Sequence, residues 1–197
     1  LDGAAVKQAL LEAGLFGYIN QLPYAVSTTP DTAPKAIFVS ALRDMPLAAD
    51  FEVELAGNEE AFQAGLTALS KIAKTYLGIG AQQQSAALTG AKNVEVNVFD
   101  GACPAGNVGV QVNNIDPVNK GEVVWTVDPA AVIFFGRLFL TGKVDLHKKV
   151  AVAGSEMKEA GYANVLVGTS LSAFVEAQMK TKEHVRLING NPLTGVK

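Results

Sequence analysis

The sequence has few of the residues on which several kinds of functional site depend. It contains one cysteine, Cys103, and two histidines, His147 and His184, in 197 residues. A single cysteine excludes internal disulfides and cysteine-built zinc sites, and it fits a reducing compartment. Neither histidine has a second ligand at helical spacing, so neither predicts a metal site. We expect Cys103 to be a small buried residue and both histidines to be solvated.

Long apolar runs and an excess of one charge are also missing. The most apolar segment, 130–140, is about half as long as a membrane-spanning helix and contains Arg137. Sixteen basic and nineteen acidic residues leave a net charge of −3, which argues against a nucleic-acid partner. Hydrophobic residues make up 49% of the chain and charged residues 18%. This apolar composition predicts a surface that contacts a partner.

Signals for phosphate binding and nucleophilic catalysis are incomplete. The sequence contains no Gly-Lys-Ser or Gly-Lys-Thr, which excludes a P-loop, and no Gly-x-Ser-x-Gly elbow. Gly78-Ile79-Gly80 follows an apolar strand, as in a dinucleotide-binding turn, but Gln83 stands where the third glycine belongs. We favour an ordinary strand-to-helix turn at this position over a nucleotide site.

Strand-like and helix-like segments alternate through the first three quarters of the chain. Asn58 and Asp128 occupy N-cap positions, and Pro129 stands at a first helical position. Three prolines in 20–34 predict an irregular loop. Strands are predicted at 36–41, 76–79, 93–99 and 122–127, and helices at 3–14, 59–74, 82–88 and 129–142. The alternation predicts an α/β domain with a parallel sheet.

The pattern changes near residue 143. Strands are predicted at 144–153, 164–167 and 185–188, with one short helix at 170–175. Strands separated by a short helix predict a compact α+β unit, so we expect domains at 1–143 and 144–197. The aromatic helix before the boundary is expected to bury one side in the core. Its other side faces either the second unit or another subunit.

Residues 99–109 form the strongest candidate for a binding site. An Asp100-Gly101 turn ends a predicted strand, Pro104 stiffens the exit, and Gly106 and Gly109 expose the backbone where a helix begins. Corners of this kind bind ligands in open α/β sheets. The sequence therefore predicts a small-molecule crevice at this strand end.

Each feature of this corner also has a structural alternative. Pro104, Gly106 and Gly109 line either a flat apolar slot or a close helix contact. Asp100 and Asp116 serve either as ligand-binding carboxylates or as the first residues of Asp-Gly and Asp-Pro turns. The residue types alone leave both alternatives open.

Short stretches along nearly the whole chain resemble the A subunit of the bacterial Na+-translocating NADH:quinone reductase in order and spacing. They are Ala13–Leu15, Ala36–Val39, Pro46–Ala49, Phe62–Leu69, Phe99–Gly109, Asp116–Val118, Trp125, Gly136–Gly142, Val150–Gly154 and Leu193–Gly195. Ten ordered stretches are far more specific than any single motif in this chain. We therefore expect the chain to be an internal fragment of that subunit, without the family's N- and C-terminal parts.

This resemblance implies a fold and a setting. The expected fold is a Rossmann-like doubly wound α/β domain followed by a small soluble ligand-binding β-grasp (SLBB) domain. The implied protein is a peripheral subunit on the cytoplasmic side of the bacterial inner membrane, without a transmembrane segment of its own. It belongs to a six-subunit pump that oxidises NADH, reduces ubiquinone and exports Na+. Its partners are the other subunits, in particular the membrane subunit that contacts quinone.

The resemblance also implies a ligand. Ubiquinone is the candidate, and the expected quinone-binding residues are Phe99, Asp100, Gly101, Pro104, Gly106 and Gly109. We expect no catalytic residue, metal or covalent cofactor in this fragment. FMN is not expected because the glycine-rich flavin loop of related proteins is absent. Many family members carry Leu in place of Asn107 and Thr-His in place of Val110-Gln111, so no role of that histidine transfers to this chain.

The residues leave two other classes of function open. One is an autonomous nucleotide- or flavin-binding oxidoreductase, and the other is a purely structural interaction module. A coloured, flavin-containing protein would favour the first class, whereas binding to a membrane subunit without any ligand response would favour the second.

Overall fold

The computed structural model describes residues 1–196. The helices are α1 (Gly3–Glu12), α2 (Phe51–Leu55), α3 (Glu59–Ile72), α4 (Ala86–Thr89), α5 (Val108–Ile115), α6 (Pro129–Thr141) and α7 (Leu171–Val175), with 3-10 turns η1 (Phe16–Tyr18) and η2 (Glu176–Gln178). The strands are β1 (Ile19–Leu22), β2 (Val26–Ser27), β3 (Ile37–Ser40), β4 (Thr75–Gly80), β5 (Glu95–Phe99), β6 (Val124–Val127), β7 (His147–Val152) and β8 (Gly161–Leu166). These elements confirm the α/β class.

The main sheet is mixed rather than parallel throughout. Its strand order is β2-β1-β6-β3-β4-β5, in which β6, β3, β4 and β5 are parallel and β1 is antiparallel to both neighbours. The prediction of an irregular loop over 20–34 is wrong for the first part of this segment, because β1 and β2 pair there as a short hairpin. Polar Asn20 and Gln21 gave no strand pattern, but both pair with β6. Backbone pairing at the sheet overrode their weak propensity.

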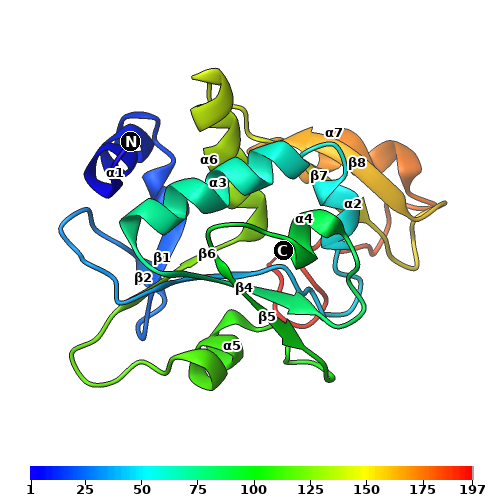
Figure 1. Cartoon of the computed structure of the whole chain (residues 1–197). Helices are drawn as coiled ribbons and strands as arrows, with labels where there is room; N and C mark the ends of the chain where they lie inside the picture. The colour runs from blue at the N-terminus through cyan, green and yellow to red at the C-terminus, as the bar shows by residue number, and fades with distance from the viewer. Residues whose placement is uncertain (197) are drawn as a thin grey trace.

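Helices cover both faces of this sheet (Figure 1). Val39 and Leu77 point to one face, into a core formed with α1, α3 and α6. Phe38 and Tyr76 alternate to the other face, where they pack with Val112 of α5. Strands buried on both sides produce the continuous apolar runs seen in the sequence.

The helices α3 and α6 cross at glycines. A Cβ at Gly136 would overlap the carbonyl oxygen of Ala61, and a Cβ at Gly65 would overlap that of Val132. The two backbones therefore touch directly, and this crossing positions the side chains at the C-terminal half of α6.

The predicted start of α6 is confirmed. The Asp128 carboxylate accepts a hydrogen bond of 2.9 Å from the Ala130 amide, and Pro129 occupies the first turn. Gly142 ends the helix in a left-handed conformation. Among the described residues, no helix is long and apolar enough to cross a membrane.

The segment after α6 forms a small second unit. Its strands β7 and β8 pair antiparallel, and α7 follows them. The predicted strand at 185–188 is wrong, since this segment has no pairing partner within residues 1–196; the nearest bridge joins Asn189 to Val196. The predicted boundary after residue 143 falls between α6 and β7.

Several local predictions were also wrong. α2 was not predicted, and the helix predicted at 82–88 is confined to α4. Cys103 is exposed rather than buried, and its sulfur lies 3.7 Å from that of Met45. β5 ends the sheet, so Val98 is 64% exposed. α2 and α4 are too short to show helical periodicity, and β5 mixes polar with apolar residues, unlike a strand buried on both sides.

Candidate functional site

A large groove lies at the carboxyl ends of the parallel strands, between the α/β domain and the second unit. The chain runs from β3 outward to β4 and β5, then returns to place β6 on the other side of β3. Ligands of open α/β sheets bind where the strand order reverses in this way. A groove of about 1590 Å³ lies there, lined by Ser40 and Asp128 beside these strand ends and by Val150 and Val165 of the second unit.

The loop before α5 is held to the loop after β3 at one wall of this groove. The Ser40 hydroxyl donates to the Gly106 carbonyl oxygen (2.9 Å), and the Gly106 amide donates to the Asp44 carboxylate (2.8 Å). A Cβ at Gly106 would lie 2.6 Å from the carbonyl oxygen of Leu42. Gly106 is therefore required by close backbone approach, which supports the packing alternative for this glycine.

The structure brings one of the six expected quinone-binding residues into the groove lining. Gly106 lines the groove, together with its neighbours Asn107 and Val108. The other five residues lie outside this lining: Phe99, Asp100, Gly101, Pro104 and Gly109. Quinone binding at the six positions stays a prediction.

Asp116 is engaged in a local ion-pair cluster. Its carboxylate contacts the Lys35 ammonium, which also lies 3.0 Å from the Glu122 carboxylate. Hydrogen bonds to Asp116 and Glu122 raise the pKa of Lys35. These contacts favour the structural alternative for Asp116.

The glycine pair of β4 is part of the strand. Gly78 and Gly80 lie at the end of β4, and the predicted strand-to-helix turn follows directly: the Gln83 amide donates to the Gly80 carbonyl oxygen (3.0 Å), and α4 is the next element. The Gly80 amide donates to the Gln83 side chain (2.8 Å), whereas a Cβ at Gly78 would overlap the Gln111 side chain. Both glycines therefore have packing roles.

Two of the three positions expected to depart from the family pattern have structural roles. Asn107 caps α5 by accepting a hydrogen bond of 2.8 Å from the Gly109 amide. Gln111 is 1% exposed and donates to the Ala105 carbonyl oxygen (3.1 Å). The Gln111 side chain is thus sealed beneath the loop before α5.

A group of three charged residues lies at the groove, and the sequence indicated only one of them, Asp128, as a helix cap. The Arg43 guanidinium lies 3.1 Å from the Glu54 carboxylate and 3.4 Å from that of Asp128. Glu54 is 2% exposed, and burial raises its pKa despite the Arg43 and Lys148 charges. α2 carries Glu54, and its five residues are too few to show helical periodicity.

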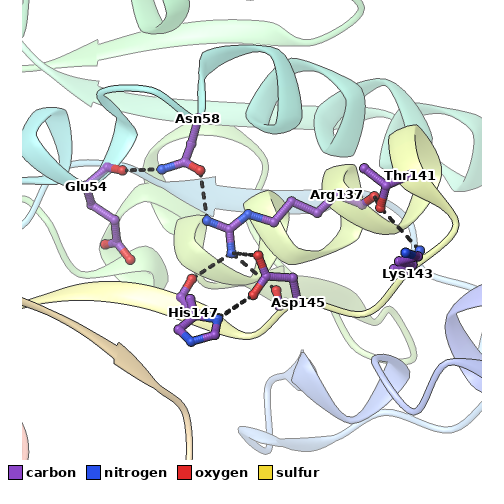
Figure 2. Close-up of polar contacts among 7 residues, drawn as sticks. All are labelled: Glu54, Asn58, Arg137, Thr141, Lys143, Asp145 and His147. Atoms are coloured by element: carbon purple, nitrogen blue, oxygen red, sulfur yellow. Dashed lines mark hydrogen bonds and ion pairs between the residues drawn. The ribbon is translucent and has the colours of Figure 1, made fainter.

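Arg137 joins the two units. Its guanidinium donates to the Asn58 side chain (2.8 Å) and to the carbonyl oxygens of Asp145 (3.2 Å) and His147 (2.6 Å) (Figure 2). Asn58 stands at the N-cap of α3, as predicted, but its side chain makes no capping bond; its amide donates to the Glu54 carbonyl oxygen instead. His147 is exposed, as predicted, and hydrogen-bonds to the Asp145 carboxylate (2.7 Å).

A second, smaller cavity lies at the same junction. Its volume is about 220 Å³, and Ile133 and Phe134 of α6 face Lys148 and Asn164 of the hairpin across it. The second side of α6 is therefore directed toward the seam between the units. Within residues 1–196, no group of three or more His, Cys, Asp or Glu residues is placed to hold a metal ion.

The fold and the groove define a class: a mixed α/β domain with a smaller hairpin unit, with a ligand-sized groove between them at a strand-order reversal. Residues 1–144 match the family described as the NqrA second alpha/beta domain, and residues 149–197 match the NQRA C-terminal domain. The chain belongs to the NqrA family, the A subunits of the Na(+)-translocating NADH-quinone reductases, which confirms the expected resemblance.

Individual relatives agree with this assignment. The A subunit of the Na(+)-translocating NADH-quinone reductase from Vibrio vulnificus strain YJ016 is 35% identical over 99% of the chain, which covers 44% of that protein. The corresponding protein of Pseudomonas aeruginosa PAO1 is 34% identical over 99% of the chain and is covered to 43%. The chain thus spans less than half the length of these curated relatives.

Proposed function

We propose that this chain is part of the peripheral A subunit of a Na+-pumping NADH:ubiquinone reductase, on the cytoplasmic side of the bacterial inner membrane. The match of both family domains in order, over almost the whole chain, carries this proposal. The chain would contribute to assembly with the other subunits, including the quinone-contacting membrane subunit. The chain alone would supply binding surfaces rather than a complete reaction.

The two finer fold assignments belong to the same proposal. Helices on both faces of the sheet and the order reversal at β3 support a Rossmann-like first domain. The antiparallel β7–β8 hairpin followed by α7 supports a β-grasp (SLBB) second domain.

Within that subunit, the groove at the strand ends is the proposed place of quinone contact. A quinone has a flat ring with carbonyl acceptors and an apolar tail. The groove offers apolar Val150 and Val165 for the ring and tail, and Arg43 as a hydrogen-bond donor at its edge. Pockets that combine apolar walls with a few polar groups are typical of small-molecule sites.

Amide chemical shifts of the isotopically labelled chain would test the quinone contact. Short-chain ubiquinone, NADH and FMN are titrated separately, and we expect saturable shifts at Gly106 and Asn107 with the quinone alone. Leu47→Trp adds bulk to the groove lining and should abolish these shifts, whereas the matched Leu140→Trp change at an exposed position near the end of α6 should leave them. Quinone shifts elsewhere, or saturable FMN binding, would refute the proposed site and ligand.

Assembly is tested on the full-length protein that contains this chain. The tagged protein, extracted from its native membranes, should co-purify with Na+-stimulated NADH:quinone reductase activity. Recovery of the folded protein free of that activity would contradict the assembly proposal. This outcome is independent of the quinone titration.

A further inference from the structure

The second unit is fastened to α2, a helix at the edge of the groove. The Lys149 ammonium donates to the carbonyl oxygens of Val53 and Ala56, each at 2.9 Å. The Asp50 amide donates to the Tyr162 hydroxyl (3.1 Å). These bonds satisfy the backbone at both ends of a five-residue helix, so β7 and β8 act as its cover (Figure 1).

The same cover seals a carboxylate on α2 away from water. Glu54 is 2% exposed, and its Oε1 atom has no hydrogen-bond partner within the described structure, while its Oε2 atom has the Arg43 guanidinium at 3.1 Å. Figure 2 shows this carboxylate pointing away from the Asn58 and Arg137 contacts. A buried carboxylate with a single charged partner is unfavourable, because that partner replaces only part of its lost hydration.

The charges around Glu54 only partly compensate for this burial. Arg43, from the loop after β3, lies 3.1 Å from its Oε2 atom, and Lys148 of β7 also attracts it. Asp128 at the start of α6 repels it. Burial is the largest influence, so the pKa of Glu54 lies above its ordinary value.

We propose that the second unit is a proton-controlled lid over the groove, which closes when Glu54 is neutral and opens to hydrate Glu54 when it is ionised. Closing transfers one proton from solvent to the carboxylate, and opening returns it. Because the groove is lined by both units, opening changes its width. The proposal concerns the lid alone and holds for any ligand of the groove.

The direction of the pH effect follows from proton linkage. In the open state Glu54 is hydrated and titrates near its ordinary pKa of 4.5, whereas in the closed state its pKa is raised. The closed state therefore binds the proton more tightly, and closure is strongest below pH 4.5 and weakens as pH rises through the raised value. A single proton changes the closed-to-open ratio by up to about tenfold per pH unit.

Distances between spin labels on the two units test the lid. Labels are placed at exposed Lys120 and Glu159 in a Cys103→Ser background, and distance distributions are recorded upward from pH 4.5. We expect the longer-distance population to grow as pH rises. Glu54→Gln should abolish this change and hold the short distance, because the glutamine cannot ionise.

Two further variants keep the test decisive. Glu60→Gln removes an exposed carboxylate from neighbouring α3 and should behave like the parent. Lys149→Met removes two bonds to α2 and should shift the population toward the long distance at every pH, with faster hydrogen exchange in residues 51–56. One pH-independent distance in the parent, or the same pH response in the folded Glu54→Gln variant, would overturn the proposal.

Discussion

Replacing Gly136 by alanine separates two physical effects that change the free energy of unfolding in opposite directions. In a helix interior, alanine is favoured over glycine by about 1 kcal/mol, so sequence reasoning alone predicts stabilisation. In the structure, a Cβ at Gly136 would overlap the Ala61 carbonyl oxygen and lie 2.5 Å from the carbonyl carbon and 2.9 Å from the Cα of Ala61. These atoms are all backbone, so no side chain can rotate away.

The magnitude follows from the separation that the new methyl group requires. Carbon atoms in contact lie about 3.5–4.0 Å apart, so α3 and α6 must part by about 1 Å, and such a gap forfeits roughly a quarter to a half of the facing dispersion energy. Overpacking of this kind costs about 1–3 kcal/mol or more. Because the overlapping atoms are backbone, the upper end of about 3 kcal/mol applies, and with the propensity gain of about 1 kcal/mol subtracted we expect a net loss of about 2 kcal/mol in the free energy of unfolding.

Thermal and urea unfolding followed by circular dichroism measure this loss. For a chain of this size, a loss of about 2 kcal/mol lowers the Tm by roughly 4–8 °C. Gly17→Ala is the matched control, because a Cβ at Gly17 meets nothing within 4 Å. A Gly136→Ala variant as stable as the parent, or more stable, would refute the close crossing of α3 and α6.

Three further predictions concern single side chains. Arg137→Met should lower the free energy of unfolding in urea by about 2–4 kcal/mol, because several hydrogen bonds from a charged donor are lost. A loss no larger than that of Arg186→Met at an exposed position would contradict the role of Arg137 in joining the two units. Asp128→Ala should cost about 1 kcal/mol through the lost cap, and an unchanged unfolding midpoint would refute the cap. The hydrogen bond from His147 lowers the pKa of Asp145 below 3.8, so its stabilisation is present above pH 3.8 and is lost as pH falls through the lowered value. The Tm difference between the parent and Asp145→Asn should shrink on acidification, and a constant difference would contradict this.

The elements with strong local signals were predicted well from the sequence. The Asp128-Pro129 start and the apolar pattern of α3 depend on neighbours within a few turns of the same helix. β1 and α2 were missed because each is short and is stabilised by another part of the chain. For β1 that partner is β6, and for α2 it is Lys149 of β7.

The candidate site was predicted less completely. The glycine-rich corner led to Gly106, which lines the groove. Asp44 and Arg43 were not indicated, because their roles depend on contacts with residues distant in sequence: Gly106 for Asp44, and Glu54 and Asp128 for Arg43. Single charged residues in loops carry no periodicity, so only their placement in space shows what they contact.

The sequence by itself determined the α/β class, the caps and faces of the long helices, and membership of the NqrA family. These features depend on the spacing of neighbouring residues and on the order of short stretches, both of which can be read from the sequence directly. Only the tertiary structure decided where the groove lies, that Arg137 joins the two units, and that Glu54 is sealed from water. Burial and charge pairing arise from residues brought together by folding, so the linear order of the chain does not encode them locally.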